Sequence, residues 1–146
     1  MRELPRKLTV DELAELFEGR TRFVELLAAT DDPLRRAEEL LATVGYEDKL
    51  EALNAHPAIG QRAGLSARSA AEQGVDAATA VLDELERLNV AYEDRFGFRF
   101  VVFVNGRSKT EILEVLRGRI ENTEEEELET ACRELVAIAR DRWIRT

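Results

Sequence analysis

Residues that bind metals or cross-link a chain are almost absent from this sequence. Among its 146 residues it has one cysteine, Cys132, and one histidine, His56. A single cysteine excludes an internal disulfide and any metal site built from several cysteines. A single histidine excludes the zinc motifs that use paired histidines. We therefore expect no metal site.

The sequence also lacks long hydrophobic runs and an excess of positive charge. No apolar stretch approaches the ~20 residues of a membrane span, and we find neither a secretory signal nor a C-terminal Ser-Lys-Leu signal. The 30 acidic residues outnumber the 21 basic ones and give a net charge of −9. Nucleic acids and anionic membranes are instead bound by clustered Lys and Arg. We expect a cytoplasmic protein that binds neither of them.

Helical patterns dominate the chain, which is long enough for one domain over residues 1–146. Capping boxes begin helices after Thr9 and Ser108, and the first of these helices is expected to end at Gly19. Only residues 96–104 have the composition of a strand, and a single strand would leave its backbone groups unpaired. We expect that stretch to be buried, extended backbone between helices. The prediction is an all-α fold, a single compact bundle of seven or eight mostly short helices.

His56 lies where a helix must stop, because Pro57 restricts the residue before it. Residues 56–68 have no helical period, and a loop of this length in a small domain is often functional. Histidine titrates nearest to neutral pH, so His56 is a candidate general acid or base. The alternative is a histidine that only stabilises the helix C-terminus through its dipole.

Ser69 and Glu72 have the spacing of a capping box. That box explains both residues without any function. The same helix start would also offer free N–H groups to an anion, and Glu72 could then face a histidine across the loop.

Arg142 lies on the apolar face of the last predicted helix. Leu128, Cys132, Leu135, Ile138 and Ala139 define that face, and the next step of three or four residues reaches Arg142. A buried arginine needs a carboxylate partner; the alternative is a frayed helix end whose side chain reaches water. Together, His56, Glu72 and Arg142 suggest a pocket for a small carboxylate substrate and for proton transfer without metal or cofactor.

Three ordered stretches resemble the OHCU decarboxylases, which act on 2-oxo-4-hydroxy-4-carboxy-5-ureidoimidazoline (OHCU) in urate breakdown. The stretches are His56-Pro57-Ala58-Ile59-Gly60, Ser69-x-x-Glu72-Gln73 and Leu88-Asn89-x-x-Tyr92-x-x-Arg95-Phe96-Gly97-Phe98-x-Phe100-Val101. Arg107-Ser108-Lys109 and Asn122 continue the resemblance, which extends over about residues 10–143. The family commonly has proline where this sequence has Arg99.

The resemblance implies an all-helical, often homodimeric enzyme with a cofactor-free active site. The family's catalytic histidine and its partner carboxylate correspond to His56 and Glu72. Its substrate contacts correspond to Pro57, Ser69, Gln73, the backbone of Phe100, Val101, Val102, Phe103 and Val104, and the side chain of Arg142.

We therefore expect a carboxy-lyase that converts OHCU to (S)-allantoin in purine catabolism. Two alternatives stay open. One is a related lyase or hydrolase that acts on another ureido acid. The other is a non-catalytic helical interaction module, in which His56, Glu72 and Arg142 would lie apart.

Overall fold

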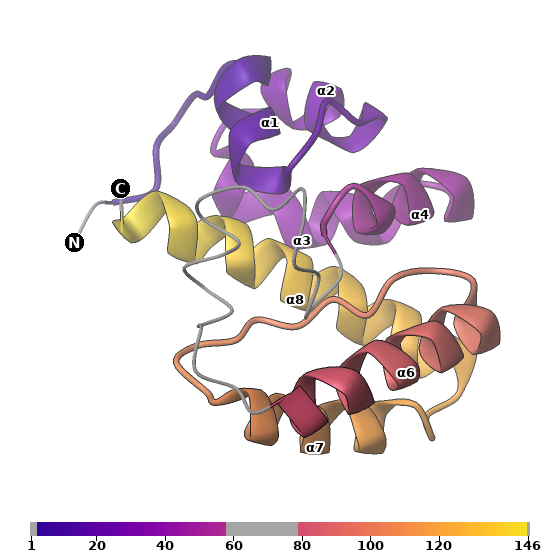
Figure 1. Ribbon diagram of the computed structural model, residues 1–146. Helices are drawn as coiled ribbons and strands as arrows, with labels where there is room; N and C mark the ends of the chain where they lie inside the picture. The colour runs from indigo at the N-terminus through magenta and orange to yellow at the C-terminus, as the bar shows by residue number, and fades with distance from the viewer. Residues whose placement is uncertain (1–2, 58–78, 146) are drawn as a thin grey trace.

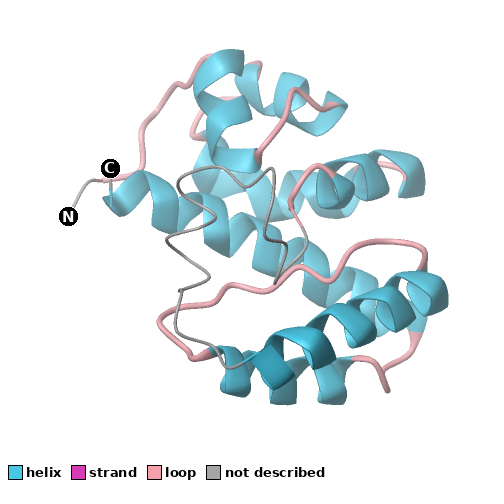
Figure 2. Ribbon diagram, viewed as in Figure 1, coloured by secondary structure: helices cyan, strands magenta, loops and turns pink. Residues whose placement is uncertain are grey.

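The computed structural model describes residues 3–57 and 79–145, and every regular element in these two ranges is a helix (Figures 1 and 2). The seven helices are α1 Val10–Phe17, α2 Arg22–Ala28, α3 Pro33–Thr43, α4 Tyr46–Asn54, α6 Thr79–Phe96, α7 Lys109–Arg119 and α8 Glu124–Arg145. The predicted all-α class is confirmed. No helix within the described ranges combines the length and the apolar character needed to cross a membrane.

The predicted capping boxes form and set where helices begin. In α1 the Thr9 hydroxyl accepts from the Glu12 N–H at 3.1 Å, and the Thr9 N–H donates to the Glu12 carboxylate at 2.9 Å. In α7 Ser108 and Glu111 make the same pair of bonds, at 3.2 and 3.0 Å. Each box gives a hydrogen-bond acceptor to two backbone N–H groups at a helix start, where the helix itself provides none.

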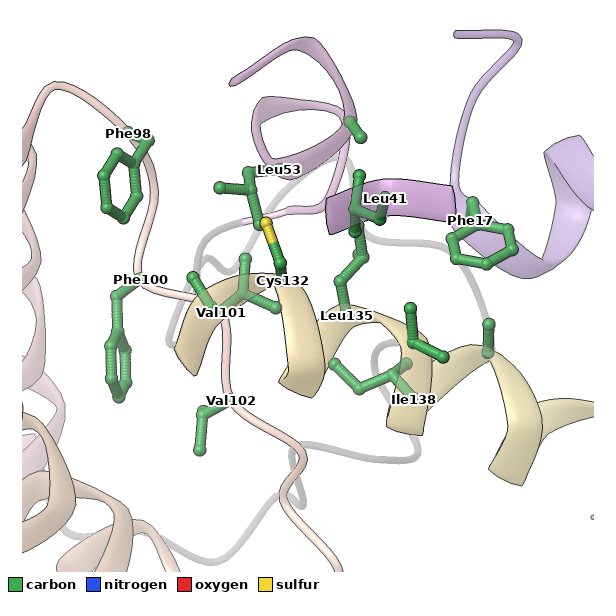
Figure 3. Close-up of a cluster of buried hydrophobic side chains, with 14 of the residues drawn as sticks. Phe17, Leu41, Leu53, Phe98, Phe100, Val101, Val102, Cys132, Leu135 and Ile138 are labelled. Atoms are coloured by element: carbon green, nitrogen blue, oxygen red, sulfur yellow. The ribbon is translucent and has the colours of Figure 1, made fainter. Parts of the chain in front are cut away.

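The long helix α8 runs through the middle of the molecule (Figure 1). α1, α3 and α4 pack against it, α2 packs on those three helices, and α6 pairs with α7. Figure 3 shows side chains of α8, among them Leu135 and Ile138, between Phe17, Leu41 and Leu53 of the N-terminal helices and the extended chain that carries Phe100. One core therefore joins the two groups of helices.

The prediction for residues 96–104 holds for most of the segment: Phe96 is the last residue of α6 and Gly97 is an exposed turn with φ = 80°, whereas residues 98–104 are mostly buried backbone with no strand partner in the described ranges. Side chains take over the role of a partner strand. Arg119 donates to the Val101 carbonyl at 2.7 Å, and the Phe103 N–H donates to the Glu134 carboxylate at 3.2 Å. The phenyl ring of Phe100 lies under the Arg119 guanidinium, 4.6 Å from its carbon.

Arg119 belongs to a buried polar cluster that connects α6, α7 and α8. Its guanidinium donates to both oxygens of Glu127, whose side chain is completely buried, with the shortest distance at 2.6 Å. The Tyr92 hydroxyl and the Asn122 amide also donate to the Glu127 carboxylate. Two charges removed from water thus compensate each other, and neutral donors take up the remaining acceptor capacity.

The end of α1 differs from the prediction. Glu18, and not Gly19, takes the left-handed conformation that ends the helix, with φ = 67°. A Cβ atom at Gly19 would lie 3.3 Å from the Cβ of Ala55, so glycine at this position allows close approach to the end of α4. At Gly19 the absence of a side chain therefore allows close packing, and the left-handed residue of the turn is Glu18.

Candidate active site

His56 is a buried residue held in place through its backbone. It follows α4 directly, and only 8% of its surface is exposed. Its N–H donates to the Leu53 carbonyl at 3.2 Å, and its carbonyl accepts from the Arg99 guanidinium at 2.8 Å. The Arg99 N–H donates to the Asn54 side chain at 3.0 Å, which fastens the extended segment to the same helix end. The position of the imidazole is thus set from both sides.

The imidazole is neutral near pH 7. The pKa of His56 is lowered from 6.5 to about 4, mainly by burial and next by the Arg142 guanidinium, because a nearby cation disfavours the protonated ring. Glu18 acts in the opposite direction, and Arg99 adds a smaller lowering effect. The Nδ1 atom is buried and has no hydrogen-bond partner among the described residues. A neutral ring with an unused nitrogen is able to accept a proton or a hydrogen bond from a ligand.

Arg142 is the second buried group of the site. The pattern of α8 predicts that it faces inward, and the structure leaves 3% of it exposed. One guanidinium nitrogen, Nη1, donates to the Leu16 carbonyl at 2.9 Å and lies 3.1 Å from the Glu18 carboxylate. Its effect on the pKa of His56 places the guanidinium within electrostatic reach of the imidazole.

The close contact between Gly19 and Ala55 explains how these groups meet. It brings the C-terminal end of α1 to the end of α4, one residue before His56. α1 and α4 both pack on α8, which carries Arg142. Three distant parts of the sequence therefore supply an imidazole, a carboxylate and a guanidinium to one region.

The predicted backbone contacts lie in the buried extended segment. Phe100, Val101, Val102 and Val104 are buried, and Phe103 is partly buried. The Phe103 N–H is bound to Glu134, and the Phe103 carbonyl accepts from Arg107 at 2.7 Å. The backbone of Phe103 therefore already has partners within the protein.

The similarity to known proteins agrees with this arrangement. Residues 2–143 match the family OHCU decarboxylase. The chain belongs to the OHCU decarboxylase family. A 2-oxo-4-hydroxy-4-carboxy-5-ureidoimidazoline decarboxylase of Haloferax volcanii is 32% identical, over 89% of this chain and 83% of that protein. The uric acid degradation bifunctional protein TTL of Arabidopsis thaliana is 34% identical over 82% of this chain, and the chain spans 42% of that longer protein.

Among solved structures, the fold is similar to that of an OHCU decarboxylase crystallised in the presence of (S)-allantoin. The TM-score is 0.75 with 28% identity, over 90% of this chain and 94% of the other. An (S)-allantoin synthase gives a TM-score of 0.70 with 25% identity, over 93% of this chain and 48% of that one. The helical arrangement of the family is thus present here.

The structure places some of the expected family site residues and leaves others outside the described ranges. His56 and Arg142 lie in one buried region, and Pro57 follows His56 with partial exposure. Ser69, Glu72 and Gln73 lie outside the described residues, so their roles stay predictions. Within the described residues, no group of three or more His, Cys, Asp or Glu side chains could hold a metal ion.

Sequence reasoning missed Glu18 and Arg99. Glu18 directly follows the buried residues Leu13, Leu16 and Phe17 of α1 and precedes a glycine, which reads as an ordinary solvent-exposed helix end. Arg99 stands out in the sequence as a departure from the family's common proline, and a proline could not donate the N–H that Asn54 accepts. The departure was a usable signal for Arg99, whereas nothing local singled out Glu18.

Proposed function

We propose that this chain catalyses the cofactor-independent decarboxylation of OHCU to (S)-allantoin in urate breakdown. The observation that carries this proposal is a buried, neutral imidazole near the guanidinium of Arg142, with no hydrogen-bond partner for its Nδ1 atom among the described residues. Membership of the family and the names of the similar enzymes support the same substrate.

In the proposed mechanism, His56 acts as the proton-transfer group and Glu72 orients it. The substrate carries a carboxylate and a hydroxyl on one ring carbon. His56, neutral at physiological pH, hydrogen-bonds the hydroxyl and takes its proton. The bond to the carboxylate breaks and carbon dioxide leaves. The electron pair forms a C=C bond to the ureido-bearing carbon, and the pair of the adjacent C=N bond moves to the ring nitrogen, which takes a proton from water. The ring itself is therefore the electron sink, which is the role that a cofactor plays in other decarboxylases.

The remaining residues bind and orient the substrate. Arg142 and the helix start at Ser69 interact with its anionic groups, while Pro57, Gln73 and the backbone of residues 100–104 surround the ring. The apolar side chains of that segment, such as Phe100, exclude water. Protonated His56 then delivers its proton to one face of the carbon that bears the ureido group. The oxygen that lost this proton becomes the ring carbonyl, which gives the (S) product.

The experiment generates OHCU in situ from urate and follows (S)-allantoin by circular dichroism. His56→Asn is expected to fold normally and to lose about 10²–10⁴-fold in rate, which is the usual contribution of a positioned general acid or base. Glu129→Gln is the matched control, because Glu129 forms only an exposed ion pair with Arg133. Normal turnover by His56→Asn would remove His56 from the mechanism.

A different ureido acid as substrate is the second candidate function. It would use the same buried imidazole and guanidinium, those of His56 and Arg142, with a different lining around the substrate. If the wild-type chain turns over another ureido acid but not OHCU, while His56→Asn loses that activity, this second function is correct.

We also propose a cytoplasmic homodimer that is one domain over residues 1–146 and binds neither nucleic acid nor membrane. The family match over residues 2–143 supports the single domain, and the resemblance supports the dimer. The net charge of −9 supports the absence of nucleic-acid and membrane binding. The single, buried cysteine supports the cytoplasmic location. Sedimentation velocity tests the dimer directly; a monomer at micromolar concentration contradicts it.

A further inference from the structure

We propose that Glu18 is a positioning residue of this site, which holds Arg142 and offsets its positive charge so that the substrate carboxylate is bound loosely enough to leave. This inference rests on the proposed function and deepens it. It concerns a residue that the family resemblance did not single out.

Arg142, on α8, contacts the last turn of α1 and the residue that follows it. Its Nη1 atom lies 3.1 Å from the Glu18 carboxylate and donates to the Leu16 carbonyl at 2.9 Å. The Arg142 side chain is 2% exposed and that of Glu18 is 15% exposed. Both contacts offer negative charge to the guanidinium, one from a carboxylate and one from the carbonyl end of a helix. Arg142 is therefore oriented by α1 before any substrate binds.

The backbone conformation of Glu18 is unfavourable for a residue with a side chain. Its φ of 67° lies in the left-handed region, where glycine is the usual residue at a helix end. Such conformations are maintained where the surrounding structure requires them, and they cluster at functional sites. A glycine at this position would suit the turn better and would carry no carboxylate. The turn alone would thus favour glycine at position 18, yet the residue there carries a carboxylate.

The charges around His56 indicate what the carboxylate does. Among the described residues, the charged groups that act on the imidazole are Arg142, Arg99 and Glu18, and only Glu18 is negative. Without its charge, the surroundings of the imidazole would be more positive by one unit, although Arg99 would keep Glu93 at 3.8 Å. A more positive pocket would bind the ground-state carboxylate more strongly, and binding that is lost in the transition state lowers kcat. Glu18 reduces that excess charge.

The first measurement needs no substrate. His56 is the only histidine in the chain, so its C2 proton gives a single NMR signal that reports the titration of this ring. Glu18→Gln keeps the size of the side chain and removes its charge, so the pKa of His56 is expected to fall below that of the wild type. Arg142→Met is expected to raise it. Glu18→Asp retains the charge and should move the pKa back toward the wild type, and the exposed Glu129→Gln control should not move it.

The second measurement is the split between kcat and KM. Glu18→Gln is expected to lower KM for OHCU a few-fold and to lower kcat about tenfold. Inhibition by acetate, used as a simple carboxylate probe, should become stronger. Glu18→Gly should show the same kinetic change with a smaller loss of melting temperature than Glu18→Gln, because it relieves the left-handed conformation. That variant separates loss of the carboxylate from loss of stability.

The outcomes separate this proposal from the proposed reaction. If Glu18→Gln leaves the His56 titration, KM and kcat within twofold of the wild type, the proposal is overturned. A fall in activity that merely follows a fall in the folded fraction overturns it as well. If the wild-type chain does not turn over OHCU, but Glu18→Gln shifts the pKa of His56, the proposed reaction is contradicted. The electrostatic effect of Glu18 on Arg142 and His56 is then still supported.

Discussion

Two buried arginines pair with carboxylates on opposite halves of α8, and the two pairs differ in what surrounds them. In one pair Glu127 of α8 meets Arg119 of α7; in the other Arg142 of α8 meets Glu18 at the end of α1. The first carboxylate is completely buried, and the second has 15% of its side chain exposed. The first pair is close to the start of α8 and the second close to its end.

The neighbours of each pair show which one serves the fold. The Glu127 carboxylate accepts from Arg119, Tyr92 and Asn122, and Arg119 also holds the Val101 carbonyl. No titratable group in that cluster has a buried polar atom without a partner. The Arg142 pair instead lies within electrostatic reach of His56, whose Nδ1 has no partner among the described residues. Because an incompletely satisfied polar group lies next to a buried ion pair there, we propose that this end of the helix serves the reaction and the other end the fold.

Removing the two carboxylates is expected to give unequal losses of stability. Glu127→Gln should lower the free energy of unfolding by about 3–5 kcal/mol, because it leaves Arg119 buried without its counter-charge. Glu18→Gln should cost clearly less, since the exposed part of that side chain lets water replace it. Urea unfolding of both variants checks this difference. Equal losses would remove the distinction between a structural and a functional pair.

The pH dependence of stability should follow His56. The unfolded ring binds its proton near pH 6.5, whereas the folded ring does so only near pH 4. The contribution of the neutral ring to the free energy of unfolding is therefore fully present above pH 6.5 and is lost as the pH falls to about 4. The loss amounts to roughly 3 kcal/mol. The difference between wild type and His56→Asn, measured by urea unfolding from pH 4 to 8, isolates this contribution. Parallel curves would contradict it.

Glu134 is expected to stabilise the fold and the extended segment through the hydrogen bond that its carboxylate oxygen accepts from the Phe103 N–H. Glu134→Leu leaves the Phe103 N–H without its carboxylate partner, which should cost about 1–2 kcal/mol in the free energy of unfolding and raise KM through the displaced segment. Glu134→Gln keeps an oxygen acceptor and should restore most of both values. Denaturant unfolding and steady-state kinetics provide the test. If Gln is as damaging as Leu, charge rather than the hydrogen bond holds the segment.

Lys109 is a buried cation without a partner carboxylate, and it is expected to show the smallest effect, with the opposite sign. It is 7% exposed, its Nζ has no hydrogen-bond partner among the described residues, and burial lowers its pKa from 10.5 to about 8. Lys109→Met should raise the free energy of unfolding by about 1 kcal/mol at pH 7. The gain should shrink between pH 8 and 10.5, where the folded wild-type amine becomes neutral before the unfolded one. A loss of stability at pH 7 would show that Lys109 has a favourable role.

Local patterns predicted much of the fold and part of the site. The capping boxes at Thr9 and Ser108 depend on residues three apart, and both form. The inward position of Arg142 depends on helical periodicity, and the side chain is buried. The missing strand partner of residues 96–104 indicated a buried extended chain, and residues 98–104 form one. Each of these inferences uses neighbours along the chain.

Other features depend on contacts between distant segments and could not be predicted this way. The partners that replace a strand, Arg119 and Glu134, are 18 and 31 residues away from the groups they bind. Gly19 packs closely against Ala55, beside the left-handed Glu18, and no pattern within α1 indicates that contact.

The sequence alone determined a helical chain with one histidine, an inward arginine near its end and a buried extended segment. It did so because capping, periodicity and composition act over a few residues. Only the tertiary structure decided that a carboxylate at the end of α1 lies against that arginine and that the imidazole is neutral. Both depend on burial and on the field of charges more than 30 residues away along the chain, which become defined only when the helices pack.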